Sequence, residues 1–144
     1  MNKDQITVKQ IKKFLNTVDK DFPIPLSNRQ NLDDLAQKFY EKATFCVKIK
    51  NGEIISAMIG YTDNLIEDFA YLSVVATLPT ERGNGYATVL LKEFIGICRD
   101  KKVRAIHLYT NKRAESLYRK QGFIDYVAAN ETRPNDIHLV LYLR

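Results

Sequence analysis

The six residues from 82 to 87 read Arg82-Gly83-Asn84-Gly85-Tyr86-Ala87. An apolar stretch at residues 70–76 precedes them, and residues 87–98 carry apolar side chains at the three- and four-residue spacing of a helix. This order predicts a central strand, a glycine-rich turn and a long helix. The first turn of a helix has unpaired N–H groups and a partial positive charge, so the turn is suited to bind phosphate. The alternative is a plain strand-to-helix turn that only needs glycine.

The sequence before this block predicts two helices and three strands. Residues 8–22 place apolar side chains three and four positions apart, which indicates an amphipathic helix. Asn31 is a typical cap for a second helix. The apolar period then changes to two over residues 45–61, and the Asn-Gly pair at 51–52 within this range is a strong hairpin signal. A third strand is expected at residues 66–77.

The sequence after the long helix predicts a strand at residues 103–109 and a short helix that follows Asn111 and ends at Gly122. Strands at residues 123–128 and 137–143 close the chain. The expected order is ααβββαβαββ. It predicts a mixed α/β protein in which one sheet is packed against helices.

Length and composition fit one domain over residues 1–144, with a formal net charge of +5 that favours anionic partners slightly. Because Lys and Arg are dispersed, no nucleic-acid partner is expected. No apolar run reaches about 18 residues and the amino end is polar, so we expect no membrane span, no signal peptide and a cytoplasmic location. Cys46 and Cys98 stand apart from any His or Cys cluster, which predicts no metal site and a core role for both.

Two blocks of the chain resemble motifs of the GNAT acetyltransferases, the Gcn5-related N-acetyltransferase superfamily. The Q/R-x-x-G-x-G/A motif of that family is matched by Arg82, Gly85 and Ala87. Its N-x-x-A-x-x-L-Y-x-x-x-G-F block is matched by Asn111, Ala114, Leu117, Tyr118, Gly122 and Phe123. The resemblance covers about residues 44–128. It implies a GNAT fold, with a central mixed, mostly antiparallel twisted sheet of about six to seven strands, splayed at its centre and flanked by about four helices.

The resemblance also implies acetyl-CoA as the co-substrate and assigns residues to it. The pantetheine arm would pair with strand groups left free by the splay, and it would accept or donate a hydrogen bond at Asn111, whose alternative role is to cap a helix. The pyrophosphate would lie on the N–H groups of the glycine loop. The implied cofactor-binding residues are Val75, Ala76, Thr77, Arg82, Gly83, Asn84, Gly85, Tyr86, Ala87, Asn111 and Tyr118. The alternative for the three strand residues is an ordinary place in the core.

Tyr118 is the catalytic residue that the resemblance implies. Acetyl transfer turns the CoA sulfur into a leaving thiolate, and a phenol can hydrogen-bond or protonate it. The alternative is a tyrosine that only packs. The implied reaction is direct transfer in a ternary complex, in which a neutral amine attacks the thioester and a strand N–H near Val75 stabilises the developing oxyanion.

A general base is not evident in the sequence. Some family members carry a glutamate early in the central strand, and Tyr71 occupies that position here. Glu67 and Asp68 are candidates, although surface carboxylates are common at the start of a strand. His107 and His138 are expected to be structural, and proton transfer to water is an equal alternative.

The acceptor is expected to be a small-molecule or protein amine, bound near residues 22–30 and 128–135, where Arg29 and Arg133 would suit an anionic group. A homodimer is possible from family habit. The alternative function is a non-catalytic acyl-CoA-binding module on the same fold. A nucleic-acid-binding domain, suggested by the basic isoelectric point near 9.2, lacks a recognition-helix pattern.

Overall fold

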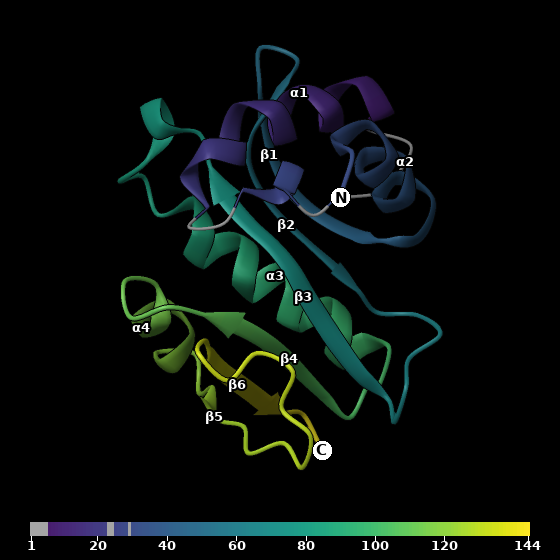
Figure 1. Cartoon of the computed structure of the whole chain (residues 1–144), viewed down its shortest axis with the longest axis vertical. Coiled ribbons are helices and arrows are strands. Elements are labelled where there is room, and N and C mark those ends of the chain that lie inside the picture. The colour runs from purple at the N-terminus through teal and green to yellow at the C-terminus, as the bar shows by residue number, and fades with distance from the viewer. Residues whose placement is uncertain (1–5, 23–24, 29) are drawn as a thin grey trace.

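The protein is described by a computed structural model over residues 6–22, 25–28 and 30–144. A six-stranded mixed sheet, in the order β1-β2-β3-β4-β6-β5, is flanked by four α-helices (Figure 1). The helices are α1 (Val8–Val18), α2 (Leu32–Lys42), α3 (Tyr86–Asp100) and α4 (Glu115–Arg119). The strands are β1 (Thr44–Lys50), β2 (Glu53–Tyr61), β3 (Phe69–Thr77), β4 (Ala105–Thr110), β5 (Ile124–Asp125) and β6 (Ile137–Tyr142). The expected element order and fold class are therefore confirmed.

Two apolar clusters hold the helices to opposite faces of the sheet. One cluster joins α3 and Tyr118 of α4 to the face that carries Leu72 and Ile106. The other joins α1 and α2 to the face that carries Ile59 and Val74. The alternation of strand side chains decides which residues meet each helix layer. Helices α1 and α2 cover this second face mainly over β1 and β2, which leaves it open over β4 and β6.

Local capping explains where the first two helices begin. Thr7 and Gln10 form a reciprocal capping box at α1, and the Asn31 side chain accepts hydrogen bonds from two backbone N–H groups at the start of α2. The first helix is shorter than expected, because residues Asp19–Asp21 form a 3₁₀ turn, η2, after Val18. Two further 3₁₀ turns, η3 (Leu26–Asn28) and η4 (Pro79–Glu81), lie in the connections.

The Asn-Gly hairpin and two strand boundaries show how backbone angles limit the strands. Residues 51 and 52 have φ of 53° and 77°, as the expected tight turn requires. The third strand begins at Phe69 instead of residue 66, because Glu67 and Asp68 have φ of 56° and 65°, which no strand accommodates. The strand expected at residues 123–128 is reduced to β5, since pairing with β6 covers only two residues.

The two central strands diverge. Strands β3 and β4 are parallel and pair only at Phe69–Ala105, Ala70–Ile106 and Tyr71–His107. Beyond Tyr71, β3 still pairs with β2 as far as Thr77, whereas its other edge has no ladder partner in β4, and Figure 1 shows β4 turning away toward α4. The predicted splay is present, and it leaves backbone groups of β3 unpaired by β4.

Candidate functional site

The glycine loop, residues 82–87, follows β3 and the turn η4 and includes the start of α3. Gly85 precedes the helix with φ 75°, and Gly83 has φ 86°. A Cβ added at either glycine would meet no atom within 4 Å, so the loop is open on that side. No side chain caps α3, and its first N–H groups are therefore available to an anion.

The side chains of the glycine loop are engaged within the protein. The Arg82 Nη2 donates to Asp21 Oδ2 at 2.8 Å, and its Nε donates to the Thr77 carbonyl at 3.3 Å. Asn84 Nδ2 donates to the Glu81 carbonyl at 3.0 Å. These contacts of Arg82 tie the loop to η2 and to the end of β3. The groups of the loop that remain available to an anion are backbone N–H groups.

The end of β3 presents the three strand residues named from the sequence. Val75, Ala76 and Thr77 are half-buried, and one edge of their backbone pairs with β2. Thr77 Oγ1 lies 2.8 Å from Ser56 Oγ, which anchors the strand end. The opposite edge lies in the splay. Val75 and Ala87 pack against the same apolar cluster that contains Tyr118, so the strand, the glycine loop and α4 meet in one region.

Asn111 takes the capping role that was its alternative. Its Oδ1 accepts a hydrogen bond from the Ala114 N–H at 3.1 Å and closes the turn before α4. The side chain is exposed. The amide NH₂ of Asn111 is the group left to donate to another molecule.

Tyr118 is almost completely buried, with 4% of its surface exposed. Its ring packs edge-on against Phe123, with centroids 5.8 Å apart. Burial raises the pKa of its phenol far above the ordinary value near 10. No residue within the described ranges hydrogen-bonds its hydroxyl. The hydroxyl oxygen is not among the fully buried atoms, so it keeps some exposure to solvent. The phenol therefore keeps its proton at neutral pH and has that proton free to donate.

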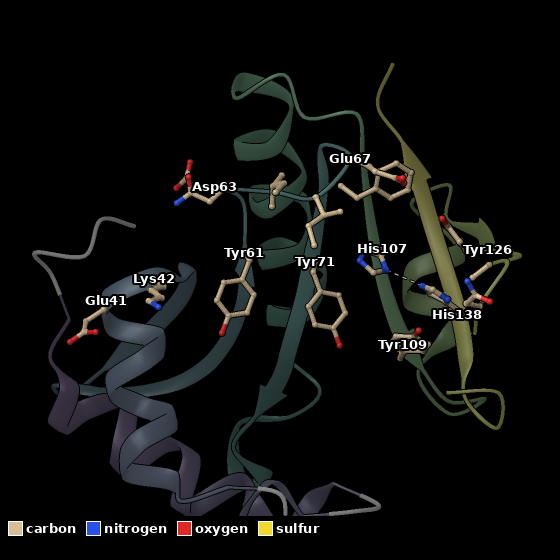
Figure 2. A pocket seen from close by; sticks show the side chains of 16 residues that line it. Glu41, Lys42, Tyr61, Asp63, Glu67, Tyr71, His107, Tyr109, Tyr126 and His138 are labelled. Carbon is tan, nitrogen blue, oxygen red and sulfur yellow. Dashed lines mark hydrogen bonds between the residues drawn. The ribbon is translucent and has the colours of Figure 1, made fainter. Parts of the chain in front are cut away.

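A cavity of about 850 Å³ opens on the α1/α2 face of the sheet, beside the splay (Figure 2). Three carboxylates and one ammonium line it, from Glu41, Asp63, Glu67 and Lys42. Aromatic and imidazole side chains form its wall over the strands, from Tyr61, Phe69, Tyr71, His107, Tyr109, Tyr126 and His138. Tyr71 and His107 are the last residues to pair before the splay, so the cavity reaches the point where β3 and β4 separate.

The cavity overlaps only part of the region expected for the acceptor, at Ala128 and Asn130. Residues of α2, the β2–β3 connection and the segment after β5 line the cavity. Arg29 lies outside the described residues. Arg133 donates to Asp136 at 2.6 Å and stacks over the Tyr109 ring, so its guanidinium is engaged within the protein.

The sequence did not reveal a hydrogen-bonded chain of three side chains at the cavity wall. His107 Nδ1 lies 2.9 Å from His138 Nε2, and His138 Nδ1 lies 2.7 Å from Glu131 Oε2. The Tyr109 hydroxyl also donates to Glu131, at 2.6 Å. Alternation along the strands places both histidines on one face, but only the β4–β6 register and the loop after β5 bring the carboxylate to them.

Hydrogen bonds and burial move the pKa values in this chain. Donation by Tyr109, by the Arg133 N–H and by His138 lowers the pKa of Glu131 to about 2. Burial lowers the pKa of His107, and His138 lowers it further, whereas Glu131 opposes both effects. At neutral pH, Glu131 is ionised and His107 is neutral.

The acid sensitivity of folding tests the Glu131 contacts. An unfolded glutamate has a pKa near 4.3, so the stabilisation that accompanies the lowered pKa is complete above that value. It is lost as the pH falls toward 2. We expect Glu131→Gln to reduce the free energy of unfolding more at pH 6 than at pH 2.5, measured by urea denaturation. An equal difference at both pH values would contradict the assignment.

Other sequence candidates have simpler roles. Asp68 forms an ion pair with Arg144, and Glu67 lies at the cavity. Cys46 and Cys98 are fully buried, and burial raises the pKa of each thiol to about 12.

No group of three His, Cys, Asp or Glu side chains within the described ranges is arranged to hold a metal ion. Among these same residues, no helix has the length and apolar character to cross a membrane.

Comparison with known proteins supports the fold and the family. The model of the acetyltransferase (GNAT) family matches residues 11–123. No curated protein matches the chain in sequence. A GNAT-family acetyltransferase from Staphylococcus aureus is 16% identical with a TM-score of 0.73, and the match covers 100% of this chain and 96% of that one.

Two further similar structures contain coenzyme A. Rv2747 from Mycobacterium tuberculosis, in complex with CoA, is 15% identical with a TM-score of 0.73, over 97% of this chain and 98% of that one. The PaiA N-acetyltransferase from Thermoplasma acidophilum, in complex with coenzyme A, is 12% identical with a TM-score of 0.67, over 96% of each chain. With a family match over most of its length and this shared fold, the protein belongs to the GNAT acetyltransferase family.

Proposed function

We propose that the protein transfers the acetyl group of acetyl-CoA directly to a primary amine of a small molecule or a protein. The observation that carries this proposal is the splay of β3 from β4, because three features meet there. They are the open glycine loop, the buried phenol of Tyr118 and the aromatic cavity. Acetyl-CoA would supply the activated acyl group.

The residues at the splay fit that co-substrate. The N–H groups of the glycine loop suit a pyrophosphate, since Gly83 and Gly85 leave open space where a Cβ would stand. The free edge of β3 at residues 75–77 suits the two amides of a pantetheine arm, which can pair as an added strand does. The NH₂ of Asn111 is a further donor beside it.

The cavity suits the acceptor. Tyrosine rings attract a cation through their faces, and the carboxylates of Glu41 and Glu67 add negative charge. Asp63 is already paired with Lys101 at 2.8 Å and contributes less. An amine that enters as an ammonium ion is therefore better matched to this cavity than an anionic acceptor.

A binding and turnover experiment tests the proposal. Acetyl-CoA at about 100 times its Kd should stabilise the fold by about 2.7 kcal/mol. The melting temperature should then rise by roughly 8 °C for a chain of this size. Thiol release from acetyl-CoA is then followed with a panel of amines, and at least one amine should accelerate it. Stabilisation without any amine-dependent release would contradict the enzyme and favour an acyl-CoA-binding module.

A pair of glycine substitutions tests the glycine loop. Gly85 and Gly52 have φ of 75° and 77°, and neither has an atom within 4 Å of an added Cβ. Valine in this conformation costs each site about the same backbone strain, 1–2 kcal/mol or more. We expect Gly85→Val to weaken acetyl-CoA binding at least about tenfold, because its side chain would fill the space proposed for phosphate.

Gly52→Val is the matched control, since its hairpin lies outside the proposed site. Both variants should melt at similar temperatures, and only Gly85→Val should lose affinity in isothermal titration. Equal affinities in the two variants would remove the glycine loop from the cofactor site.

A further inference from the structure

The hydrogen-bonded side chains of Glu131, His138 and His107 have the geometry of a proton relay. Glu131 contacts His138 at 2.7 Å, and His138 contacts His107 at 2.9 Å. His138 is well buried, with 8% of its side-chain surface exposed. The relay of three side chains thus runs from the segment after β5, through β6, to the cavity wall on β4.

The ionised carboxylate decides which ring nitrogens carry protons. A carboxylate can only accept, so His138 Nδ1 must hold a proton. When both imidazoles are neutral, each has one N–H, so His138 Nε2 accepts from His107 Nδ1. His107 Nε2 is then the bare nitrogen. Figure 2 shows this second nitrogen of His107 on the side that faces Tyr71 and the cavity.

His107 also occupies the right place in the sheet. It pairs with Tyr71 in the last rung before the splay, and the two rings lie 5.0 Å apart. The proposed thioester lies next to Val75, four residues further along β3, so a proton would reach His107 through water in the cavity. His107 faces the cavity side of the sheet, whereas Tyr118 belongs to the cluster on the α3 side. The two groups therefore approach the splay from opposite faces.

From this arrangement, and resting on the proposed function, we propose that His107 is the general base that takes a proton from the acceptor amine. His138 and Glu131 are positioning residues, which hold the imidazole in the required tautomer and accept its charge. The sequence had suggested a structural role for both histidines.

The proton transfers balance. The ammonium ion first loses one proton to solvent. As the resulting neutral amine nitrogen bonds to the thioester carbon, one of its remaining protons passes to His107 Nε2 through water in the cavity. The C–S bond breaks with its electron pair on sulfur, which takes the proton of the Tyr118 hydroxyl. The Nδ1 proton of His107 can then move to His138 Nε2, which places the positive charge beside Glu131. Solvent returns one proton to the Tyr118 oxygen and removes one from the histidine pair.

The surroundings of His107 favour the neutral base before reaction. Burial lowers its pKa below the usual 6.5, and the neighbouring His138 has the same effect. The titratable groups that face it from the packed elements are Tyr71 on β3, His138 on β6, Tyr126 and Glu131 after β5, and Glu67 at the cavity. Glu131 opposes the decrease and would stabilise the imidazolium once it forms.

Nitrogen NMR of the histidine rings tests the tautomer without turnover. The chain contains two histidines, so labelling with ¹⁵N-histidine gives two imidazoles to assign. At pH 7.5 in the free protein, we expect His107 to carry its proton on Nδ1 and to leave Nε2 bare. A proton on His107 Nε2 would turn the cavity-facing nitrogen into a donor and overturn the proposal.

Kinetics test the base itself. With the best amine of the panel, His107→Gln should lower kcat/KM about 10²-fold and remove the acidic limb of its pH profile, while acetyl-CoA affinity stays unchanged. Glu131→Gln should keep the limb but move it to lower pH, because a negative charge that raises the pKa of His107 is gone. If these residues only pack, neither substitution should change the acidic limb of the pH profile.

The outcomes separate the two proposals. If the wild-type protein acetylates an amine and His107→Gln keeps both its rate and its pH profile, the base assignment is wrong and the enzyme assignment stands. If no amine is acetylated while the NMR shows the expected tautomer, the enzyme assignment fails and the base assignment falls with it. Partial recovery of His107→Ala by added imidazole would support the base, since a packing role gives no such rescue.

Discussion

Tyr118→Phe should lower kcat by about 10²-fold or more, with acetyl-CoA affinity nearly unchanged. The change removes only the proton that the phenol would give to the leaving sulfur, and positioned acids contribute about 10²–10⁴-fold. The raised pKa of the phenol keeps it protonated throughout the neutral range. Because none of the described residues hydrogen-bonds this hydroxyl, stability should change by less than about 1 kcal/mol. Steady-state kinetics, titration calorimetry and thermal melting measure the three quantities.

Tyr142→Phe is the control for this experiment. Tyr142 lies on β6 with half of its surface exposed, and it forms no part of the cavity lining or the glycine loop. The same loss of a hydroxyl there should leave kcat unaltered. A Tyr118→Phe enzyme with wild-type kcat, or one with unaltered kcat and greatly weakened cofactor, would show that the phenol packs or binds and is not the acid.

Gly60→Ala should destabilise the protein by roughly 3 kcal/mol, about 10 °C in melting temperature. A Cβ at this position would lie 2.6 Å from the Tyr71 carbonyl oxygen and 2.7 Å from the Phe94 ring. The Tyr71 backbone on one side and the fully buried Phe94 ring on the other leave no space for the methyl group. Gly60 also sits at the bulge that shifts the β2–β3 register, directly opposite Leu72. The strain would therefore fall on the strand that opens the splay.

Gly96→Ala is the matched substitution and should have the opposite sign. Gly96 lies inside α3, and a Cβ there would meet nothing within 4 Å. Alanine is favoured over glycine in a helix by about 1 kcal/mol, so the melting temperature should rise slightly. Urea denaturation of the two variants gives both free energies. Equal effects would show that the close approach at Gly60 is relieved by movement of the backbone.

The folding signals that could be read from the sequence are those that act over a few neighbouring residues. The Asn31 cap, the positive φ of Gly52 and of Gly85, and the element order all depend on hydrogen bonds or side-chain periods within single turns and strands. The motif around Tyr118 was found by resemblance, and the burial of that residue agrees with a protonated phenol. Even so, the start of β3 was misplaced at Ile66, because the positive φ of Glu67 and Asp68 ends the strand pattern before Phe69.

Contacts between distant segments were decided by the tertiary structure alone. Arg82 reaches Asp21 across 61 residues and ties the glycine loop to η2. His107 and His138 are 31 residues apart, and only strand register brings them within a hydrogen bond. A shift of one residue in register would turn either histidine to the other face. The sequence alone therefore determined the elements, the family, the splay and the glycine loop, whereas the packing of strands from separate parts of the chain decided the cavity and the relay beside it.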